Sequence, residues 1–115
     1  MGKEREIIVT GGRNYDDSPM MCDVLNFLAP SRVIQGGAPG ADTLAVFWCE
    51  AEDVEHKTYI ADWATHGRAA GPIRNKEMLD AHPEAVVVAF PGGRGTEDCV
   101  RQAQSRNMII LRVEK

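Results

Sequence analysis

Three glycine-rich segments, each directly after a short run of strand-forming residues, constrain the fold of this chain most strongly. The runs are residues 6–10, 32–35 and 85–90, in which β-branched apolar side chains predominate. Eight of the eleven glycines lie in the three segments: Gly11, Gly12, Gly36, Gly37, Gly40, Gly92, Gly93 and Gly95. A glycine-rich turn between a strand and a helix leaves main-chain amides facing outward at the positive end of the helix dipole. The pattern therefore predicts sites for phosphate or another anion.

Segments with helical spacing separate the strand runs. A first helix is predicted between Ser18, its expected cap, and Pro30, with Pro19 at the first helical position. A second helix is expected to bury the apolar face formed by Leu44, Phe47, Trp48 and Ala51. Further helices are predicted over 72–81 and 96–106, and further strands over 54–60 and 108–113. This alternation predicts one α/β domain over residues 1–115, with a Rossmann-like, mainly parallel five-stranded sheet and helices on both faces.

The three glycine-rich turns are expected to meet at one cleft. Right-handed crossovers place every strand-to-helix turn at the same edge of a parallel sheet, where open α/β sheets bind their ligands. Arg74 lies in the first turn of the helix predicted from Pro72, where the helix dipole disfavours a cation, so it is the cation most suggestive of an anionic ligand. Thr96, Asp42 and Asp98 are candidate helix caps; Thr96 is also expected to reach phosphate, and Asp42 is alternatively an acceptor for ribose hydroxyls. The charged residues expected around this cleft are Arg13, Arg74, Arg94, Asp42, Glu97 and Asp98.

Composition excludes several classes of function. The net charge of −4 argues against a broad basic surface for nucleic acid, and the longest apolar runs are too short to cross a membrane. Residues 1–6 lack the apolar core of a signal peptide, which favours a cytoplasmic protein. Three widely spaced cysteines without a metal-binding pattern are expected to be reduced packing residues, and no metal or cofactor is expected.

The connection over residues 61–71 contains aromatic, basic and small side chains. Trp63, His66 and Arg68 lie in it, and an aromatic ring with polar neighbours is suited to cover a nucleobase. The alternative is that Trp63 packs the connection onto the sheet. The sequence leaves both interpretations open.

Five motifs together resemble the YspA-like branch of the SLOG superfamily, which also includes the Lonely Guy proteins and Smf/DNA-processing protein A. The motifs are residues 9–17, 36–42, 61–63, 70–78 and 91–98. The resemblance implies a Rossmann-like sheet that binds a nucleotide or a nucleotide-derived ligand such as a nucleoside phosphate, ADP-ribose or an NAD-related molecule. It implies these ligand-binding residues: Gly11, Gly12, Arg13, Gly36, Gly37, Gly40, Asp42, Arg74, Asn75, Pro91, Gly92, Gly93, Arg94, Gly95 and Thr96.

The resemblance implies two alternative functions. One is a ligand sensor or sequestering module. The other is a phosphoribohydrolase that releases a free base, in which Arg74 would position the substrate while Glu97 or Asp98 stabilised positive charge on the ribose. In the Lonely Guy motif the catalytic glutamate falls on Cys99, which departs from that pattern.

A role with single-stranded DNA, by analogy with DNA-processing protein A, is the least favoured reading for this short, acidic chain. The resemblance also implies that such small sheets commonly form homo-oligomers. Trp48 or Phe47 would then lie in a subunit contact instead of the core.

Overall fold

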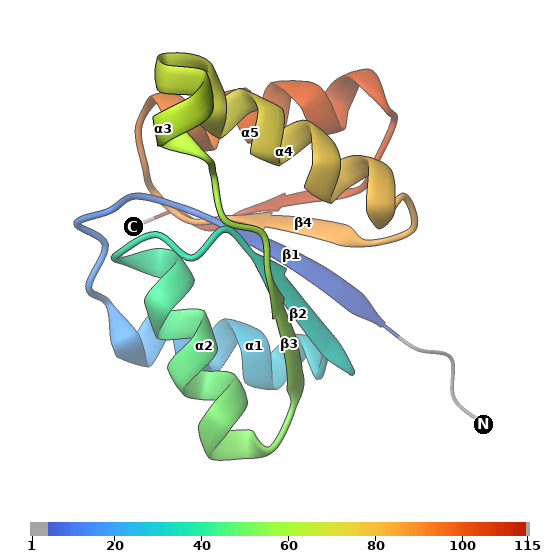
Figure 1. The fold of residues 1–115 in the computed structure, drawn as a ribbon. Helices are drawn as coiled ribbons and strands as arrows, with labels where there is room; N and C mark the ends of the chain where they lie inside the picture. Colours follow the sequence, from blue (N-terminus) through green and yellow to red (C-terminus); the bar gives the residue numbers. More distant parts are fainter. Residues whose placement is uncertain (1–4, 115) are drawn as a thin grey trace.

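The computed structural model describes residues 5–114 and contains a five-stranded, all-parallel sheet in the order β3-β2-β1-β4-β5 (Figure 1). The strands are β1 (Glu6–Thr10), β2 (Arg32–Gln35), β3 (Glu55–Thr58), β4 (Val86–Ala89) and β5 (Ile110–Arg112). The helices are α1 (Ser18–Leu28), α2 (Ala41–Glu52), α3 (Trp63–His66), the 3-10 helix η1 (Gly67–Ala69), α4 (Ala70–Ala81) and α5 (Arg94–Ser105). The predicted Rossmann-like fold class is confirmed.

Helices cover both faces of the sheet, with α1 and α2 on one face and α4 and α5 on the other (Figure 1). The central strand β1 supplies both layers because successive side chains of a strand point to opposite faces. Ile7 and Val9 are buried against Leu25 of α1, whereas Ile8 is buried against Leu79 of α4. The sheet is thus buried on both sides, which is usual for parallel sheets.

The direction in which successive strands are added to the sheet reverses at β1. It runs from β1 through β2 to β3 along one side of the sheet and then returns to place β4 and β5 on the other side. The carboxyl ends of β1 and β4 therefore lie next to each other at the topological switch point, the usual position of a ligand in an open α/β sheet.

Helix α1 begins differently from the sequence prediction. Asp17, not Ser18, is its N-cap, because a side-chain oxygen of Asp17 accepts a hydrogen bond from the amide of Met20 at 3.0 Å. Ser18 and Pro19 are the first two helical residues. Asp17 and Ser18 are both residue types that commonly cap helices. Asp17 is the cap because its side chain accepts from the amide three residues further on, that of Met20.

Helix α2 also buries a different face from the one predicted. Trp48 is buried, but Phe47 is 60% exposed and Ala51 is exposed too. The helix begins at Ala41, directly after the turn, and packs small residues closely against the sheet. The buried positions of α2 are Ala41, Asp42, Ala45, Trp48 and Cys49.

The segment predicted as an irregular connection forms two short helical turns. After β3 the chain builds α3 and η1 and continues directly into α4 at Ala70, so Pro72 is the third residue of α4. Arg74 is consequently in the second turn of α4, not in its first. Helix α5 likewise begins earlier than predicted, at Arg94.

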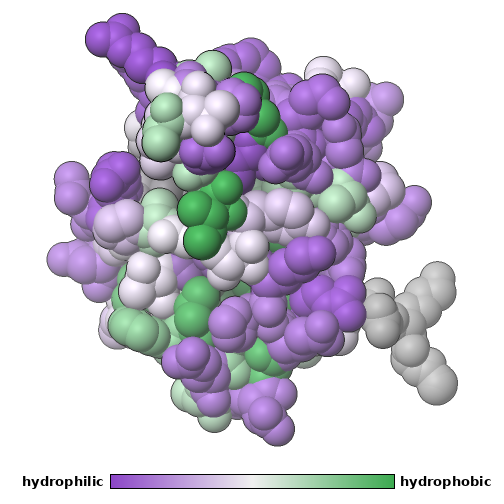
Figure 2. All heavy atoms as spheres, in the orientation of Figure 1, coloured by the Kyte–Doolittle hydropathy of each residue, from purple (hydrophilic) through white to green (hydrophobic). Residues whose placement is uncertain are grey.

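The face of the molecule in Figure 2 is mostly hydrophilic, with isolated hydrophobic side chains. The large apolar side chains that are exposed include Phe27, Phe47, Ile60 and Trp63. In the part of the chain that the structure describes, no helix has the length and apolar character needed to span a membrane.

Candidate functional site

The three glycine-rich turns pack directly on one another. The amide of Gly12, in the turn after β1, donates a hydrogen bond to the carbonyl of Pro91, after β4, at 2.8 Å. The carbonyl of Gly12 accepts from the amide of Ala41, at the start of α2, at 3.1 Å. Gly40 has a φ of +83°, and a Cβ there would lie 2.1 Å from the Gly12 oxygen. The turns therefore meet at one edge of the sheet, as the alternation of strands and helices predicts.

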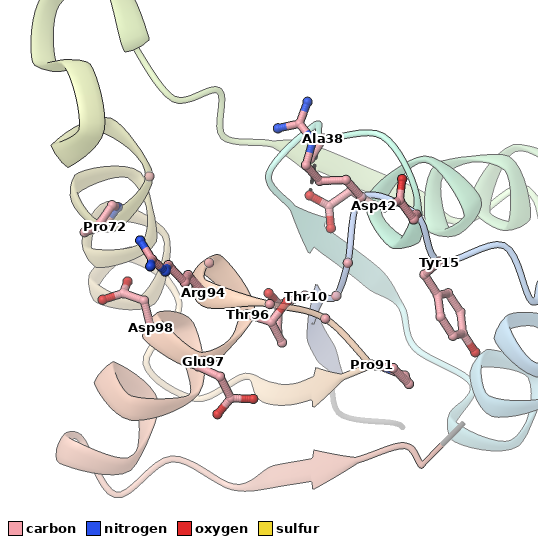
Figure 3. Close-up of a pocket in the computed structure, with 18 of the residues that line it drawn as sticks. Thr10, Tyr15, Ala38, Asp42, Pro72, Pro91, Arg94, Thr96, Glu97 and Asp98 are labelled. Atoms are coloured by element: carbon pink, nitrogen blue, oxygen red, sulfur yellow. Dashed lines mark hydrogen bonds between the residues drawn. The ribbon is translucent and has the colours of Figure 1, made fainter.

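A cleft of about 1230 Å³ opens above these turns, at the switch point between β1 and β4 (Figure 3). It is lined by Thr10, Gly11, Gly12, Arg13, Asn14, Tyr15, Asp16, Ala38, Asp42, Trp63, Arg68, Gly71, Pro72, Arg74, Pro91, Gly92, Gly93, Arg94, Gly95, Thr96, Glu97, Asp98 and Arg101. Figure 3 shows Arg94 and Asp98 of α5 on one side and Asp42 on the other.

The N-terminus of α5 presents free hydrogen-bond donors to the cleft. Gly93 is its N-cap and has no side chain to satisfy the first amides, and the first helical bond runs from the amide of Glu97 to the carbonyl of Gly93 at 3.0 Å. Within residues 5–114, the amides of Arg94, Gly95 and Thr96 have no acceptor. Thr96 is the third residue of the helix and not its cap. Three unpaired donors at the positive end of a helix are suited to hold an anion.

The glycines of the third turn differ in whether the surrounding structure leaves room for a Cβ atom. A Cβ at Gly92 would lie 2.2 Å from the Thr96 hydroxyl and 2.7 Å from the Gly12 nitrogen, so the fold itself requires glycine there. A Cβ at Gly93 or Gly95 would meet no atom within 4 Å. Gly95 lies inside a helix, where glycine is unfavourable. No contact among the described residues requires a glycine at this position.

Asp42 organises the second turn, lines the cleft and has one side-chain oxygen without a hydrogen-bond partner among the described residues. Its Oδ2 accepts hydrogen bonds from the amides of Gly36 at 3.1 Å and Ala38 at 3.2 Å. Its Oδ1 is buried and has no partner among the described residues, although the side chain lines the cleft. Burial raises the pKa of Asp42 to about 6, against the opposing effect of these amides and of Arg74. Gly40 is the N-cap of α2, so Asp42 is not a helix cap.

Arg74 links α4 to the second turn. Its Nη1 donates to the carbonyls of Gly36 at 2.9 Å and Tyr59 at 3.3 Å, and its Nε donates to the side chain of Asn75 at 2.8 Å. The side chain also lines the cleft. Nη2 makes no hydrogen bond within the described chain, so Arg74 retains donor capacity for a ligand.

Three further arginines line the cleft without a carboxylate partner. Arg13, Arg68 and Arg94 are exposed, and none of them forms an ion pair with another residue between positions 5 and 114. Arg101 also lines the cleft but lies 3.4 Å from a carboxylate oxygen of Asp98. The cleft therefore offers local positive charge on a chain whose net charge is negative.

The two acidic residues of α5 that the hydrolase alternative requires are engaged by other side chains. Glu97 accepts two hydrogen bonds from Arg112, at 2.9 and 3.2 Å, and Figure 3 shows it directed away from Arg94. The hydrogen bond with Arg112 lowers the pKa of Glu97. Asp98 lies inside the helix, where it does not act as a cap, and accepts from Asn75 at 3.0 Å and Gln102 at 2.8 Å. Both residues line the cleft, but neither carboxylate is free.

The cysteines take no part in the cleft. Cys99, which occupies the position of the Lonely Guy glutamate, is fully buried behind the cleft, and burial raises its pKa to about 11. Burial also raises the pKa of Cys49 to about 11, and Cys22 is half-buried. Thiols with such pKa values remain protonated near neutral pH, which suits packing residues and not nucleophiles.

Four of the residues implied as ligand contacts lie outside the cleft lining: Gly36, Gly37, Gly40 and Asn75. The amide of Gly37 donates to the side chain of Gln35 at 2.6 Å, and the amide of Gly36 is taken by Asp42. The second turn thus contributes Asp42 and Ala38 to the cleft, not a row of free amides. The other implied contacts all line it.

Several cleft residues were not predicted from the sequence. They are Thr10, Asn14, Tyr15, Asp16, Ala38, Gly71, Pro72 and Arg101. Residues 14–16 could have been expected in the cleft from their position in the sequence, because they continue the turn that begins at Gly11. Trp63, for which the sequence leaves two roles open, lines the cleft, and so does Arg68. No group of three metal-ligating side chains occurs within residues 5–114.

An all-parallel sheet with a cleft at its switch point, lined by glycine-rich turns, defines a Rossmann-like ligand-binding domain. The chain belongs to the YspA, cpYpsA-related SLOG family, whose model matches residues 5–66 and so includes the first two turns. It is also similar to Gene 61 protein of Mycobacterium phage D29, with 37% identity over 119 residues covering 93% of this chain and 94% of that protein. No solved structure matches it. Membership of this family indicates a nucleotide-related role in ligand binding or processing.

Proposed function

We propose that the cleft binds a phosphate-bearing nucleotide derivative, namely a nucleoside phosphate, ADP-ribose or an NAD-related molecule, as a sensor or sequestering module. One observation carries the proposal: a single cleft is lined both by the start of α5, with three amides that lack an acceptor among residues 5–114, and by Asp42, whose buried Oδ1 lacks a donor there. These two features demand opposite properties of a ligand.

The start of α5 favours the anionic part of such a ligand. The amides of Arg94, Gly95 and Thr96 supply hydrogen bonds, and the absence of a side chain at Gly95 lets an oxyanion approach the main chain. Arg13 and Arg94 line the same cleft and form no ion pair with another described residue, and a guanidinium adds charge-assisted hydrogen bonds to phosphate.

Asp42 favours a different part of the ligand. A phosphate would be repelled by this carboxylate, whereas a hydroxyl group can donate to its unpartnered Oδ1. A buried acceptor that lacks a donor costs free energy, and a ligand hydroxyl removes that cost. A molecule that carries phosphate and hydroxyl groups at separate places satisfies both requirements, which is the chemistry of a ribose phosphate.

The size of the cleft favours the larger members of this class. Its volume of about 1230 Å³ exceeds the range of about 300–1,000 Å³ that is typical of sites for drug-sized ligands. A phosphate ion alone would leave most of this space to solvent. ADP-ribose or an NAD-related molecule would occupy far more of it.

Isothermal titration calorimetry with AMP, ADP-ribose and NAD tests the proposal. We expect binding by the wild type and at least about tenfold weaker binding by Asp42→Asn, since the amide can no longer accept with a charged oxygen. Asp23→Asn is the matched control, because Asp23 is exposed on α1 and lies outside the cleft. Native mass spectrometry of freshly purified protein would add the mass of any ligand that remains bound. Absence of binding at millimolar concentrations of all three nucleotides would refute the proposal.

A second candidate, hydrolysis of the N-glycosidic bond, is favoured by the same carboxylate. Cleavage passes through an oxocarbenium-like state that a nearby anion stabilises, and Asp42 has the free oxygen that Glu97 and Asp98 lack. In this mechanism Arg74 would position the phosphate. Chromatography of nucleotide incubations would show a free base that disappears in Asp42→Asn but persists in Glu97→Gln and Asp98→Asn. If nucleotides bind and no base is released, binding alone is the function.

A further inference from the structure

Trp63 exposes an unusually large apolar surface inside the cleft. It is the first residue of α3, its side chain is 55% exposed, and it lines the same cleft as the start of α5. Tryptophan gains more than most side chains from burial. Ile60 is even more exposed, at 78%, but does not line the cleft, so exposure of an apolar side chain does not by itself place it there.

The surroundings of Trp63 hold its indole ring at a defined place. Asp62 caps α3 by accepting a hydrogen bond from the amide of Thr65 at 3.1 Å, and the amide of Gly67 bonds back to the carbonyl of Trp63. The edge of the indole lies over Gly71 of α4, where a Cβ would approach the Trp63 Cη2 atom to 3.3 Å. Glycine at position 71 thus makes room for the ring, and one edge of the indole rests on the protein.

We infer that Trp63 is the platform on which the aromatic base of the ligand stacks, and that the cleft prefers a purine to a bare sugar phosphate. The inference rests on the proposed function, because it assigns the part of the ligand that neither α5 nor Asp42 accounts for. A base is flat and apolar on both faces, with its hydrogen-bonding groups at the edge, so its face can stack on an exposed indole ring without base-specific hydrogen bonds. A purine presents a larger face than a pyrimidine.

This arrangement divides recognition between two ends of the cleft. The start of α5 and Asp42 would hold the phosphate and ribose, whereas Trp63 would contact only the base. Removing the indole must then weaken ligands that carry a base and leave a ribose phosphate unaffected. If Trp63 only packed α3 onto α4, its removal would affect all ligands of the cleft alike.

Tryptophan fluorescence provides a direct measurement. The chain has two tryptophans, and the other, Trp48, is 7% exposed, donates to the side chain of Asn26 at 2.9 Å and lies outside the cleft. Trp63→Phe keeps Trp48, so the difference between wild type and this variant reports Trp63 alone. AMP, ADP-ribose and ribose 5-phosphate are titrated into the wild type, Trp63→Phe, Trp63→Ala and the control Ile60→Ala.

The expected result is quenching of Trp63 by AMP and ADP-ribose but not by ribose 5-phosphate. Trp63→Ala should bind AMP about tenfold or more weakly, Trp63→Phe should retain most of the affinity, and ribose 5-phosphate should bind all variants equally. An equal loss for AMP and ribose 5-phosphate, or no loss for either, overturns the inference but leaves the proposed function intact. Emission that changes with protein concentration alone would place Trp63 in a contact between two copies of this chain and overturn it too. If no ligand binds the wild type, both fail.

Discussion

The guanidinium of Arg74 donates from Nη1 to the main-chain oxygen of Gly36 at 2.9 Å, and so joins α4 to the turn that follows β2. This bond crosses from the helix layer on one face of the sheet to the turn whose amides donate to Asp42. A Cβ at position 36 would lie 2.1 Å from the same Nη1 atom, so the contact depends on glycine. Arg74 therefore supports the geometry of the cleft as well as its charge.

Arg74→Ala should reduce both stability and affinity. The substitution removes three hydrogen bonds and leaves the buried Gly36 carbonyl without its donor, which we expect to lower the free energy of unfolding by about 2 kcal/mol. Nucleotide affinity should fall at least about tenfold because Asp42 loses its supporting turn and the ligand loses a cation. Urea denaturation and calorimetry measure the two effects. Glu77→Ala, at an exposed position of the same helix, is the control and should change neither.

Gly95→Ala should separate stability from binding. The new methyl group would meet no protein atom within 4 Å, and alanine is favoured over glycine inside helices, so the free energy of unfolding should rise by up to about 1 kcal/mol. Gly95 lines the cleft, and its amide is one of the donors proposed to hold phosphate, so the added methyl group should weaken nucleotide binding severalfold. Thermal unfolding and calorimetry on one preparation test both statements. A variant that is stabilised and binds normally would show that the ligand does not approach this turn.

Binding of ADP-ribose should strengthen as the pH rises through 6. Burial raises the pKa of Asp42 to about 6, and ribose hydroxyls donate best to the ionised carboxylate. At pH 5 roughly one tenth of such a group is ionised, so affinity should be about tenfold lower than at pH 7.5. ADP-ribose suits this measurement because it lacks the phosphate monoester that titrates near pH 6 in AMP. Asp42→Asn should show a flat profile; a slope that persists in this variant would assign the titration to another group.

The same carboxylate should shape the stability of the protein without ligand. Between its ordinary pKa of 3.8 and its folded value of about 6, the folded state binds more protons than the unfolded state. The free energy of unfolding must therefore fall as the pH rises through this window, by about 3 kcal/mol for a shift of this size. The difference in the free energy of unfolding, Asp42→Asn minus wild type, should therefore be more positive at pH 7 than at pH 4. Paired denaturation curves at the two pH values isolate this effect from other titrating groups.

The three thiols should differ in reactivity. Cys49 and Cys99 are fully buried with pKa values raised by burial to about 11, whereas Cys22 is half-buried. A thiol reagent at pH 7.5 should modify Cys22 first and reach the other two only when the protein is unfolded. Mass spectrometry of a timed labelling series counts the modified sites. Rapid labelling of Cys99 in the folded protein would contradict its assignment as a packing residue.

Much of the architecture could be read from the sequence because its signals are local. Strand runs such as residues 85–90 and the glycines that follow them do not depend on distant contacts, and they were sufficient to predict the parallel sheet and the meeting of three turns. The boundaries of helices were less accessible. Asp17 and Ser18 are both good caps, and only the folded backbone shows which of them reaches the amide of Met20.

The roles of individual glycines could not be read from the sequence. The sequence does not distinguish Gly37 from Gly95, yet the amide of Gly37 donates to Gln35 while that of Gly95 has no acceptor within residues 5–114. The difference arises from side chains that fold back onto the turns. The buried face of α2 was missed for a related reason, since Ala41 and Ala45 give a weaker apolar signal than Phe47 although they pack closer to the sheet.

The hydrogen bonds of Gly12 to Pro91 and from Ala41 have a consequence for how relatives of this protein can diverge. They tie the turns after β1 and β4 and the start of α2 to one another, so substitution of the closely contacted glycines Gly40 and Gly92 would disturb the fold. The segment that carries Trp63 is different: α3 and η1 are short, are held mainly by bonds within the segment, and lie outside the sheet. New ligand preferences can therefore arise by exchanging this one segment while the turns that meet at Gly12 stay unchanged.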